Sequence, residues 1–154
     1  MRQARALALL APALLLAGAY ISQYVFGLYP CEMCLWQRWP HWAALALAVL
    51  AFVPRLPVRL LTALAAGGIL VSGMIGGFHA GVEYGWWEGI TSCAATAGPA
   101  APGQSALDAI MDAPVVRCDE PPFTLAGISL AGFNFLFSVI AGLAIFRLLM
   151  ERRR

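Results

Sequence analysis

The chain has 154 residues, of which 61% are hydrophobic and only 12% are charged, and its mean hydropathy is +0.76. Because soluble domains carry roughly 25% charged residues, this composition excludes an ordinary water-soluble globular protein and indicates a membrane protein. The formal net charge of +2 is small, and we expect no nucleic acid among its partners.

Four apolar runs follow one another along the chain, each near the roughly 20 residues that cross a bilayer. We expect transmembrane helices over about residues 7–26, 35–53, 60–80 and 125–149, with one long loop over about residues 81–124. No soluble domain is left over. Residues 1–154 are therefore predicted to form one integral membrane domain, an all-α bundle of four transmembrane helices.

The first apolar run has a second interpretation, as a cleaved signal peptide. Ala17-Gly18-Ala19 resembles a cleavage site behind a short hydrophobic stretch. The hydrophobicity continues through Phe26, however, and reaches spanning length. This favours a retained helix, and both interpretations deliver the following segment to the outer side.

The charged residues divide between the two sides of the expected membrane. Eight of the ten arginines fall on one side: Arg2, Arg5, Arg55, Arg59, Arg147, Arg152, Arg153 and Arg154. Seven of the eight acidic residues fall on the other side: Glu32, Glu83, Glu88, Asp108, Asp112, Asp119 and Glu120. The positive-inside rule then places both termini in the cytoplasm. All four cysteines lie on the opposite side, which in a bacterium is the periplasm, where disulfides persist. We therefore expect a multi-pass protein of the bacterial inner membrane, with its long loop in the periplasm.

Cys31-Glu32-Met33-Cys34 is the strongest chemical motif, because it places two cysteines three residues apart at the start of an apolar helix. On a helix, Cys31, Cys34 and Arg38 have i, i+3 and i+7 spacing and share one face. A helix N-terminus and a nearby cation both favour the thiolate, which is the reactive form of cysteine. The motif predicts thiol–disulfide exchange at Cys31 and Cys34.

Cys93 and Cys118 form a second cysteine pair in the long loop, with 24 residues between them. One interpretation is a purely structural disulfide. The other is electron exchange with the first pair, since two dithiols on one side can pass electrons between them. A four-cysteine zinc site is a weaker alternative, because structural zinc sites usually use two closely spaced pairs, so we expect no metal.

Arg38 and the two histidines are the remaining candidates for function. Arg38 either extends to the lipid headgroups or stabilises a thiolate and polarises a carbonyl oxygen of a bound electron acceptor. His79 is expected at the same depth, where it either packs or hydrogen-bonds that acceptor. His41 resembles an interfacial residue, although His41 and His79 together also permit a haem-linked electron carrier.

Two local features are also expected from the sequence. Gly73, Gly77 and Gly81 recur every four residues in the third run, which lets another helix approach closely. Residues 105–113 have the apolar and acidic pattern of a short helix at the membrane surface.

These motifs resemble the DsbB family of disulfide bond formation proteins over nearly the whole chain. The resemblance rests on Cys31-x-x-Cys34 followed by Arg38, on Phe78-His79-Ala80-Gly81-Val82-Glu83, on Cys93, and on two later segments, Val115-Val116-Arg117-Cys118-Asp119-Glu120 and Gly127-Ile128-Ser129-Leu130-Ala131-Gly132-Phe133-Asn134. Vitamin K epoxide reductase relatives share a four-helix redox core but carry the CxxC near its end, unlike this chain. Gln37 occupies a variable position of the family.

The resemblance implies a thiol:quinone oxidoreductase that reoxidises a periplasmic, thioredoxin-like DsbA-type protein. By that similarity the reduced partner attacks Cys93, and Cys118 releases it and relays to Cys31. Cys34 then faces the quinone, either ubiquinone or menaquinone, with Arg38 and His79 at its ring. The non-enzymatic alternative is a membrane subunit in which Cys93 and Cys118 form a structural disulfide.

Overall fold

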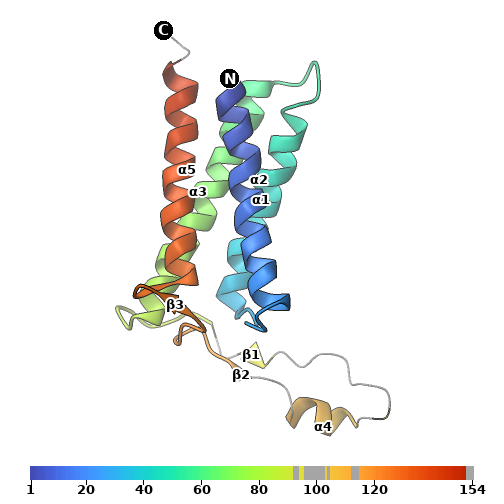
Figure 1. The fold of residues 1–154 in the computed structure, drawn as a ribbon, viewed down its shortest axis with the longest axis vertical. Helices are drawn as coiled ribbons and strands as arrows, with labels where there is room; N and C mark the ends of the chain where they lie inside the picture. The colour runs from blue at the N-terminus through green and yellow to red at the C-terminus, as the bar shows by residue number, and fades with distance from the viewer. Residues whose placement is uncertain (92–93, 96–102, 104, 112–114, 152–154) are drawn as a thin grey trace.

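Four long helices run side by side and form a bundle in the computed structural model (Figure 1). They are α1 (Arg2–Tyr24), α2 (Glu32–Leu50), α3 (Val58–Glu83) and α5 (Leu130–Glu151). The structure describes residues 1–91, 94–95, 103, 105–111 and 115–151. Helix α3 packs most extensively, against α5 and α2, while α1 lies mainly against α2 and α5. Residues of α1, α2 and α5 together line a cavity.

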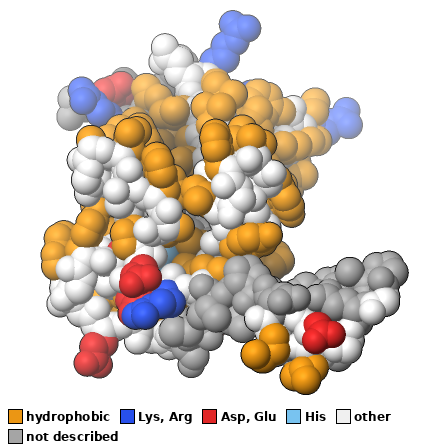
Figure 2. Space-filling view, turned by 60° about the horizontal axis from the view of Figure 1, so that its bottom comes forward, with side chains coloured by type: hydrophobic (Ala, Val, Ile, Leu, Met, Phe, Trp, Pro, Cys, Tyr) orange, Lys and Arg blue, Asp and Glu red, His pale blue; other side chains and the backbone are white. Residues whose placement is uncertain are grey.

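Three of the described helices, α1, α3 and α5, are long and apolar enough to cross a membrane, which makes the chain a multi-pass membrane protein. Helix α2 is not among them, because Gln37, Arg38 and His41 lower the hydropathy of its first half. A fourth span in α2 remains a prediction. Figure 2 shows hydrophobic side chains over the outer faces of the helices, and the exposed ones include Leu14, Ile21, Leu60, Met74, Ile140 and Leu143. Such a surface suits contact with lipid.

Both ends of the chain and the α2–α3 connection lie at one end of the bundle, whereas the long connection between α3 and α5 lies at the other (Figure 1). Near the first end the core consists mostly of small side chains, including Ala4, Ala8, Ala44, Ala48, Ala65 and Ala66. Small residues let neighbouring backbones approach closely. Two glycines of the predicted pattern let α5 approach α3 closely, because a Cβ at Gly73 would lie 2.9 Å from Ser138 and a Cβ at Gly77 would lie 2.8 Å from Phe135. A Cβ at Gly81 would instead meet Trp87, outside the helices.

The long connection contains one short helix and two small strand pairs among its described residues. Helix α4 (Ala106–Met111) lies within the expected range of 105–113, away from the bundle (Figure 1). Strand β1 (Ala94–Ala95) pairs antiparallel with β2 (Val115–Val116). This pairing holds two distant parts of the connection together just before Cys118.

A tight hairpin separates the connection from α5. Strand β3 (Thr124–Leu125) pairs with β4 (Ile128–Ser129), and the turn residues Ala126 and Gly127 have φ values of 51° and 77°. The Ser129 hydroxyl then accepts a hydrogen bond of 3.1 Å from the Gly132 amide, which caps the new helix. Helix α5 therefore begins at Leu130, five residues after the apolar run that starts at Leu125.

Candidate redox site

Cys31 and Cys34 meet at the start of α2. Cys31 is the N-cap residue of this helix, and its sulfur accepts a hydrogen bond from the Cys34 amide at 3.4 Å. The two Sγ atoms lie 3.3 Å apart, with the Cys31 thiol donating to Cys34. Thiols at this separation can form a disulfide with a small movement. The helical spacing of the motif thus gives a dithiol, as the sequence predicts.

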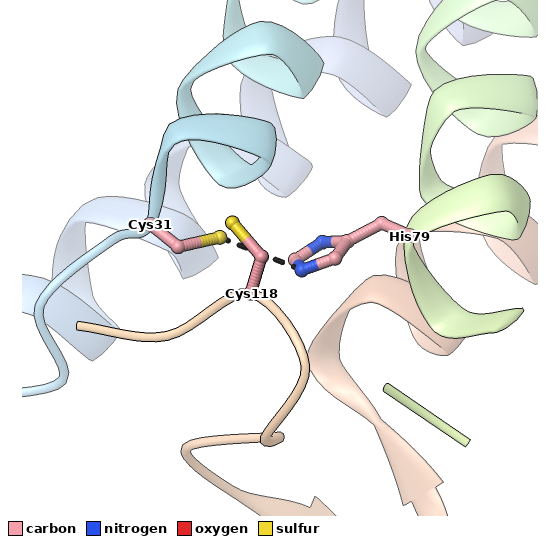
Figure 3. A group of neighbouring side chains, drawn as sticks. All are labelled: Cys31, His79 and Cys118. Carbon is pink, nitrogen blue, oxygen red and sulfur yellow. Dashed lines mark hydrogen bonds between the residues drawn. The ribbon is translucent and has the colours of Figure 1, made fainter. Parts of the chain in front are cut away.

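Cys118 and His79 approach Cys31 from two other parts of the chain (Figure 3). The Cys31 sulfur lies 3.4 Å from Nε2 of His79, a residue of α3. The sulfurs of Cys31 and Cys118 and one ring nitrogen of His79 all lie within 4.8 Å of one another, and all three side chains are buried. Cys118 also accepts a hydrogen bond of 3.2 Å from the Thr91 hydroxyl. The structure therefore places one cysteine of the loop within reach of the helical dithiol.

The same three side chains are also a donor set that a zinc ion accepts, since zinc binds thiolate sulfur and imidazole nitrogen. The zinc alternative raised by the sequence involved the four cysteines alone. Cys93 and Cys118 are widely spaced in the sequence, which argues against a zinc site. The fold brings Cys118 beside Cys31, while Cys93 lies outside the described residues. The short contacts among the sulfur atoms support thiol chemistry directly.

Burial and hydrogen bonding hold the Cys31 and Cys118 thiols in their protonated form. The hydrogen bond to Cys34, followed by burial, raises the pKa of the Cys31 thiol from 9.0 to about 12, although His79 acts in the opposite direction. Burial also raises the pKa of the Cys118 thiol, while the Thr91 hydroxyl lowers it. The thiolate that the motif predicts is therefore not favoured at Cys31, whose thiol donates a hydrogen bond to Cys34.

Cys93, the fourth predicted redox residue, lies outside the described residues. The described cysteines Cys31, Cys34 and Cys118 are all free thiols. The roles predicted for Cys93 and for its pairing with Cys118 remain predictions.

A cavity of about 270 Å³ lies between α1, α2 and α5. Its wall is mainly apolar and includes Leu14, Leu15, Ala19, Leu130, Phe133 and Phe137. The polar side chains that line it include Cys34, Gln37, Arg38, His41 and Asn134. An apolar cavity with a few convergent polar groups is typical of a small-molecule site. Cys34 thus lines a cavity while its neighbour Cys31 contacts the loop cysteine.

Arg38 is anchored to α1 at the wall of this cavity. Its guanidinium donates hydrogen bonds to Oε1 of Gln23 at 2.6 Å and to the Ala19 carbonyl at 3.4 Å, and it lies 4.9 Å from the ring centroid of Tyr20. These contacts give the charge protein partners on the neighbouring helix. Arg38 and Cys34 therefore share the cavity, as their spacing on one face of α2 suggests.

His79 lies elsewhere. It is not among the residues that line the cavity, and its ring instead contacts Cys31 and, through Nδ1, the Gln37 side chain at 2.9 Å. Glu83 Oε1 is 3.7 Å from its Nε2. The structure thus places His79 at the thiols, and its predicted hydrogen bond to an electron acceptor remains a prediction.

Sequence reasoning left out three polar residues at the cavity: Gln37, His41 and Asn134. The family resemblance makes Gln37 a variable position and the sequence makes His41 an interfacial or haem-ligating residue, yet both are buried. His41 Nε2 lies 2.9 Å from Oδ1 of Asn134, and Asn134 donates to Oε1 of Gln37 at 2.8 Å. Their signal in the sequence is that each is a polar side chain inside an otherwise apolar run, where polar groups are costly unless used.

Comparisons with known proteins agree with this geometry. The family model for "Disulfide bond formation protein DsbB" matches residues 1–148. The chain is also 25% identical over 126 residues to "Uncharacterized protein RP370" of Rickettsia prowazekii (strain Madrid E), which covers 80% of this chain and 73% of that protein. No solved structure matches it. With three helices long and apolar enough to span a membrane and its described thiols, Cys31, Cys34 and Cys118, gathered at one end, the chain belongs to the DsbB family of membrane disulfide bond formation proteins.

Proposed function

We propose that this protein is a thiol:quinone oxidoreductase that reoxidises a periplasmic DsbA-like dithiol protein. The observation that carries the proposal is that the two sulfurs of one dithiol face different parts of the protein. Cys31 contacts the loop cysteine Cys118, and Cys34 lines the cavity together with Arg38. Two adjacent sulfurs that face different surroundings are suited to receive electrons from one side and deliver them to the other.

The proposed reaction begins in the long loop. A thiolate of the reduced partner attacks the Cys93–Cys118 disulfide at Cys93, and Cys118 leaves with the electron pair of the broken bond. The Cys118 thiolate then attacks the Cys31–Cys34 disulfide at Cys31, and Cys34 leaves as a thiolate. When the partner's second thiol releases Cys93, Cys93 re-forms its bond to Cys118 and frees Cys31. Two electrons have then moved from the partner to Cys31 and Cys34.

The residues around the cavity fit a quinone headgroup. Its volume of about 270 Å³ is close to the roughly 300 Å³ at which small-molecule sites begin. Arg38 supplies guanidinium donors that can hydrogen-bond a carbonyl oxygen and favour negative charge on it. When bound, ubiquinone or menaquinone would accept the two electrons and two protons that the dithiol gives up. The apolar wall from α1 and α5 suits a lipid-soluble ring and excludes water.

The proposal includes a topology. Helix α2 is taken as a fourth span, because it lies beside α1 and α3 and its polar side chains Gln37, Arg38 and His41 have protein partners. The arginine-rich end of the bundle then lies in the cytoplasm and the thiols lie at the periplasmic surface of the inner membrane. The periplasm is an oxidising compartment, in which disulfides form and persist.

The haem alternative finds less support in the geometry. A bis-histidine haem requires one nitrogen of each ring to face the iron from opposite sides. Here His41 Nε2 contacts Asn134, while His79 contacts Gln37 and Cys31 with its two nitrogens. Both rings are held by amide partners that tie them to separate places in the bundle.

The test is quinone reduction by the purified protein in detergent, with a reduced DsbA-like protein as donor and a soluble ubiquinone or menaquinone analogue as acceptor. Wild-type protein should consume one quinone per donor disulfide formed. Cys31→Ser and Cys34→Ser should each abolish turnover. If both variants retained wild-type turnover, the non-enzymatic interpretation with a structural disulfide would replace the proposal.

A further inference from the structure

Four polar side chains form one hydrogen-bonded chain across α2, α3 and α5; Gln37, His41 and His79 are buried and Asn134 is half-buried. His79 contacts Gln37, Gln37 contacts Asn134, and Asn134 contacts His41, each at 2.8 to 2.9 Å. Unpaired polar groups are costly in an apolar interior, so such a chain is stable only when each member has a partner. The chain joins the thiols at Cys31 to the wall of the cavity.

Two backbone carbonyls fix the orientation of both amides. Gln37 Nε2 lies 3.2 Å from the Met33 carbonyl oxygen, and Asn134 Nδ2 lies 3.2 Å from the Ser72 carbonyl oxygen. A carbonyl oxygen only accepts hydrogen bonds, so the atoms facing the two carbonyls are NH₂ groups. The opposite orientation of either amide would place two acceptors against each other.

The orientation of Gln37 decides which nitrogen of His79 carries the proton. The Gln37 NH₂ group faces Nδ1 of His79 at 2.9 Å, so Nδ1 must accept. A neutral imidazole with an accepting Nδ1 carries its hydrogen on Nε2. Nε2 in turn faces the Cys31 sulfur at 3.4 Å and Glu83 Oε1 at 3.7 Å, and both of these atoms can accept.

We propose that Gln37 is a positioning residue, which holds His79 in the Nε2–H tautomer so that His79 donates a hydrogen bond to the Cys31 sulfur. The inference rests on the proposed function, in which Cys31 is the sulfur that exchanges with Cys118. When a thiolate attacks Cys118 and the Cys31–Cys118 bond breaks, the electron pair stays on Cys31. The Nε2–H group stabilises that thiolate without giving up its proton, because Nδ1 already accepts from Gln37.

The titratable groups around this contact come from three parts of the described chain. Cys34 lies on α2, Glu83 lies on α3 one turn beyond His79, and Cys118 lies on the loop. Gln37 is uncharged, so replacing it with glutamate changes the hydrogen-bonding pattern at Nδ1 in a defined way. A carboxylate accepts where the amide donates, and the ring must then carry a hydrogen on Nδ1.

The first measurement reads the tautomer directly. The chain has two histidines, so ¹⁵N-labelled imidazole NMR of the reduced protein in micelles gives two ring systems, and His41→Asn assigns them. Wild-type His79 should show the neutral Nε2–H pattern. Gln37→Glu should place protons on both nitrogens, because the carboxylate accepts from Nδ1 while the Cys31 sulfur and Glu83 still accept from Nε2. A wild-type His79 with its proton on Nδ1 would overturn the proposal.

The second measurement reads the effect on Cys31. In a Cys34→Ser background, the alkylation rate of Cys31 is followed against pH by peptide mass spectrometry. Gln37→Glu should shift the profile to lower pH by about one unit, the scale expected for a cation beside a thiolate. Gln37→Leu should shift it to higher pH, and Gln3→Glu, an exposed charge-matched control in α1, should leave it unchanged.

A double substitution separates positioning from a general structural effect. If Gln37 acts through His79, then Gln37→Glu should leave the profile unchanged once His79→Ala is present. A shift that survives His79→Ala would contradict the proposal, as would identical profiles for all Gln37 variants. Neither the tautomer nor the alkylation rate depends on quinone turnover, so failure of the proposed function would be seen separately, as loss of quinone reduction with the Gln37 effects intact.

Discussion

The Arg38 guanidinium donates a hydrogen bond of 2.6 Å to Oε1 of Gln23 and thereby ties α2 to α1 beside the cavity. The arginine is thus held in place before any ligand enters. Its position next to Cys34 in the cavity wall suits it to bind a carbonyl oxygen rather than to bind lipid headgroups alone.

Arg38→Ala should raise the apparent KM for quinone. Hydrogen bonds to charged groups contribute about 1.5–3 kcal/mol, so the increase should be roughly tenfold or more. Steady-state quinone reduction at saturating donor measures it. Gln23→Ala, which loosens the anchor but keeps the charge, should raise KM less. Unchanged kinetics in Arg38→Ala would remove this residue from the site.

Gly76→Ala should destabilise the protein and disturb the amide pair. A Cβ at Gly76 would lie 2.9 Å from the Ala131 carbonyl oxygen, 3.0 Å from Asn134 Nδ2 and 3.1 Å from Gln37 Oε1. Overpacking of this kind costs about 1–3 kcal/mol of unfolding free energy. Unfolding in mixed micelles measures the loss.

Gly67→Ala is the matched control for that substitution. Gly67 lies in the same helix, and a Cβ there would have no atom within 4 Å. Replacing a helical glycine with alanine stabilises by roughly 0.5–1 kcal/mol where there is room. Equal losses at Gly67 and Gly76 would show that the amide pair does not require the close approach of α3.

The dithiol and the long apolar helices could be predicted from the sequence because both depend on local spacing. Cys31 and Cys34 meet through three residues of one helix, and hydrophobic length alone marks α1, α3 and α5. The start of α5 at Leu130 was harder to predict. The residues from Leu125 onward are mostly apolar, but a turn at Ala126 and Gly127 delays the start of the helix.

The amide network could not be predicted, since it depends on contacts between distant parts of the chain. Gln37 is 42 positions from His79 and 97 positions from Asn134, its partners in two of these hydrogen bonds. Each is visible in the sequence as a polar residue in an apolar run. Helix packing, however, decides which of these residues form hydrogen bonds with one another. The same packing places the His79 ring beside the Cys31 sulfur.

Thr91→Val should slow the reaction of Cys118. The Thr91 hydroxyl donates a hydrogen bond of 3.2 Å to the Cys118 sulfur and lowers the pKa of that thiol, against the larger effect of burial. Valine keeps the shape and removes the donor. Because such a hydrogen bond contributes about 0.5–1.5 kcal/mol, the thiolate fraction near neutral pH should fall severalfold. Alkylation of Cys118 in the reduced protein measures this, and Thr91→Ser, which keeps the hydroxyl, should restore most of the rate.

Cys34→Ala should make the Cys31 thiol easier to ionise. The hydrogen bond to Cys34 is the largest cause that raises the pKa of Cys31 from 9.0 to about 12, so its removal should bring the pKa back toward 9. At pH 8 the thiolate fraction, and with it the alkylation rate of Cys31, should therefore rise.

The same pKa shift also makes the unfolding free energy of the reduced protein depend on pH. Since the folded-state pKa lies above the unfolded value, the reduced wild-type protein gains stability that is fully present below pH 9 and is lost as the pH rises toward 12. Cys34→Ala should show a smaller loss over that window when unfolding is followed against pH. A Cys31 profile that stayed at its wild-type position in Cys34→Ala would show that burial, and not the neighbouring sulfur, keeps this thiol protonated.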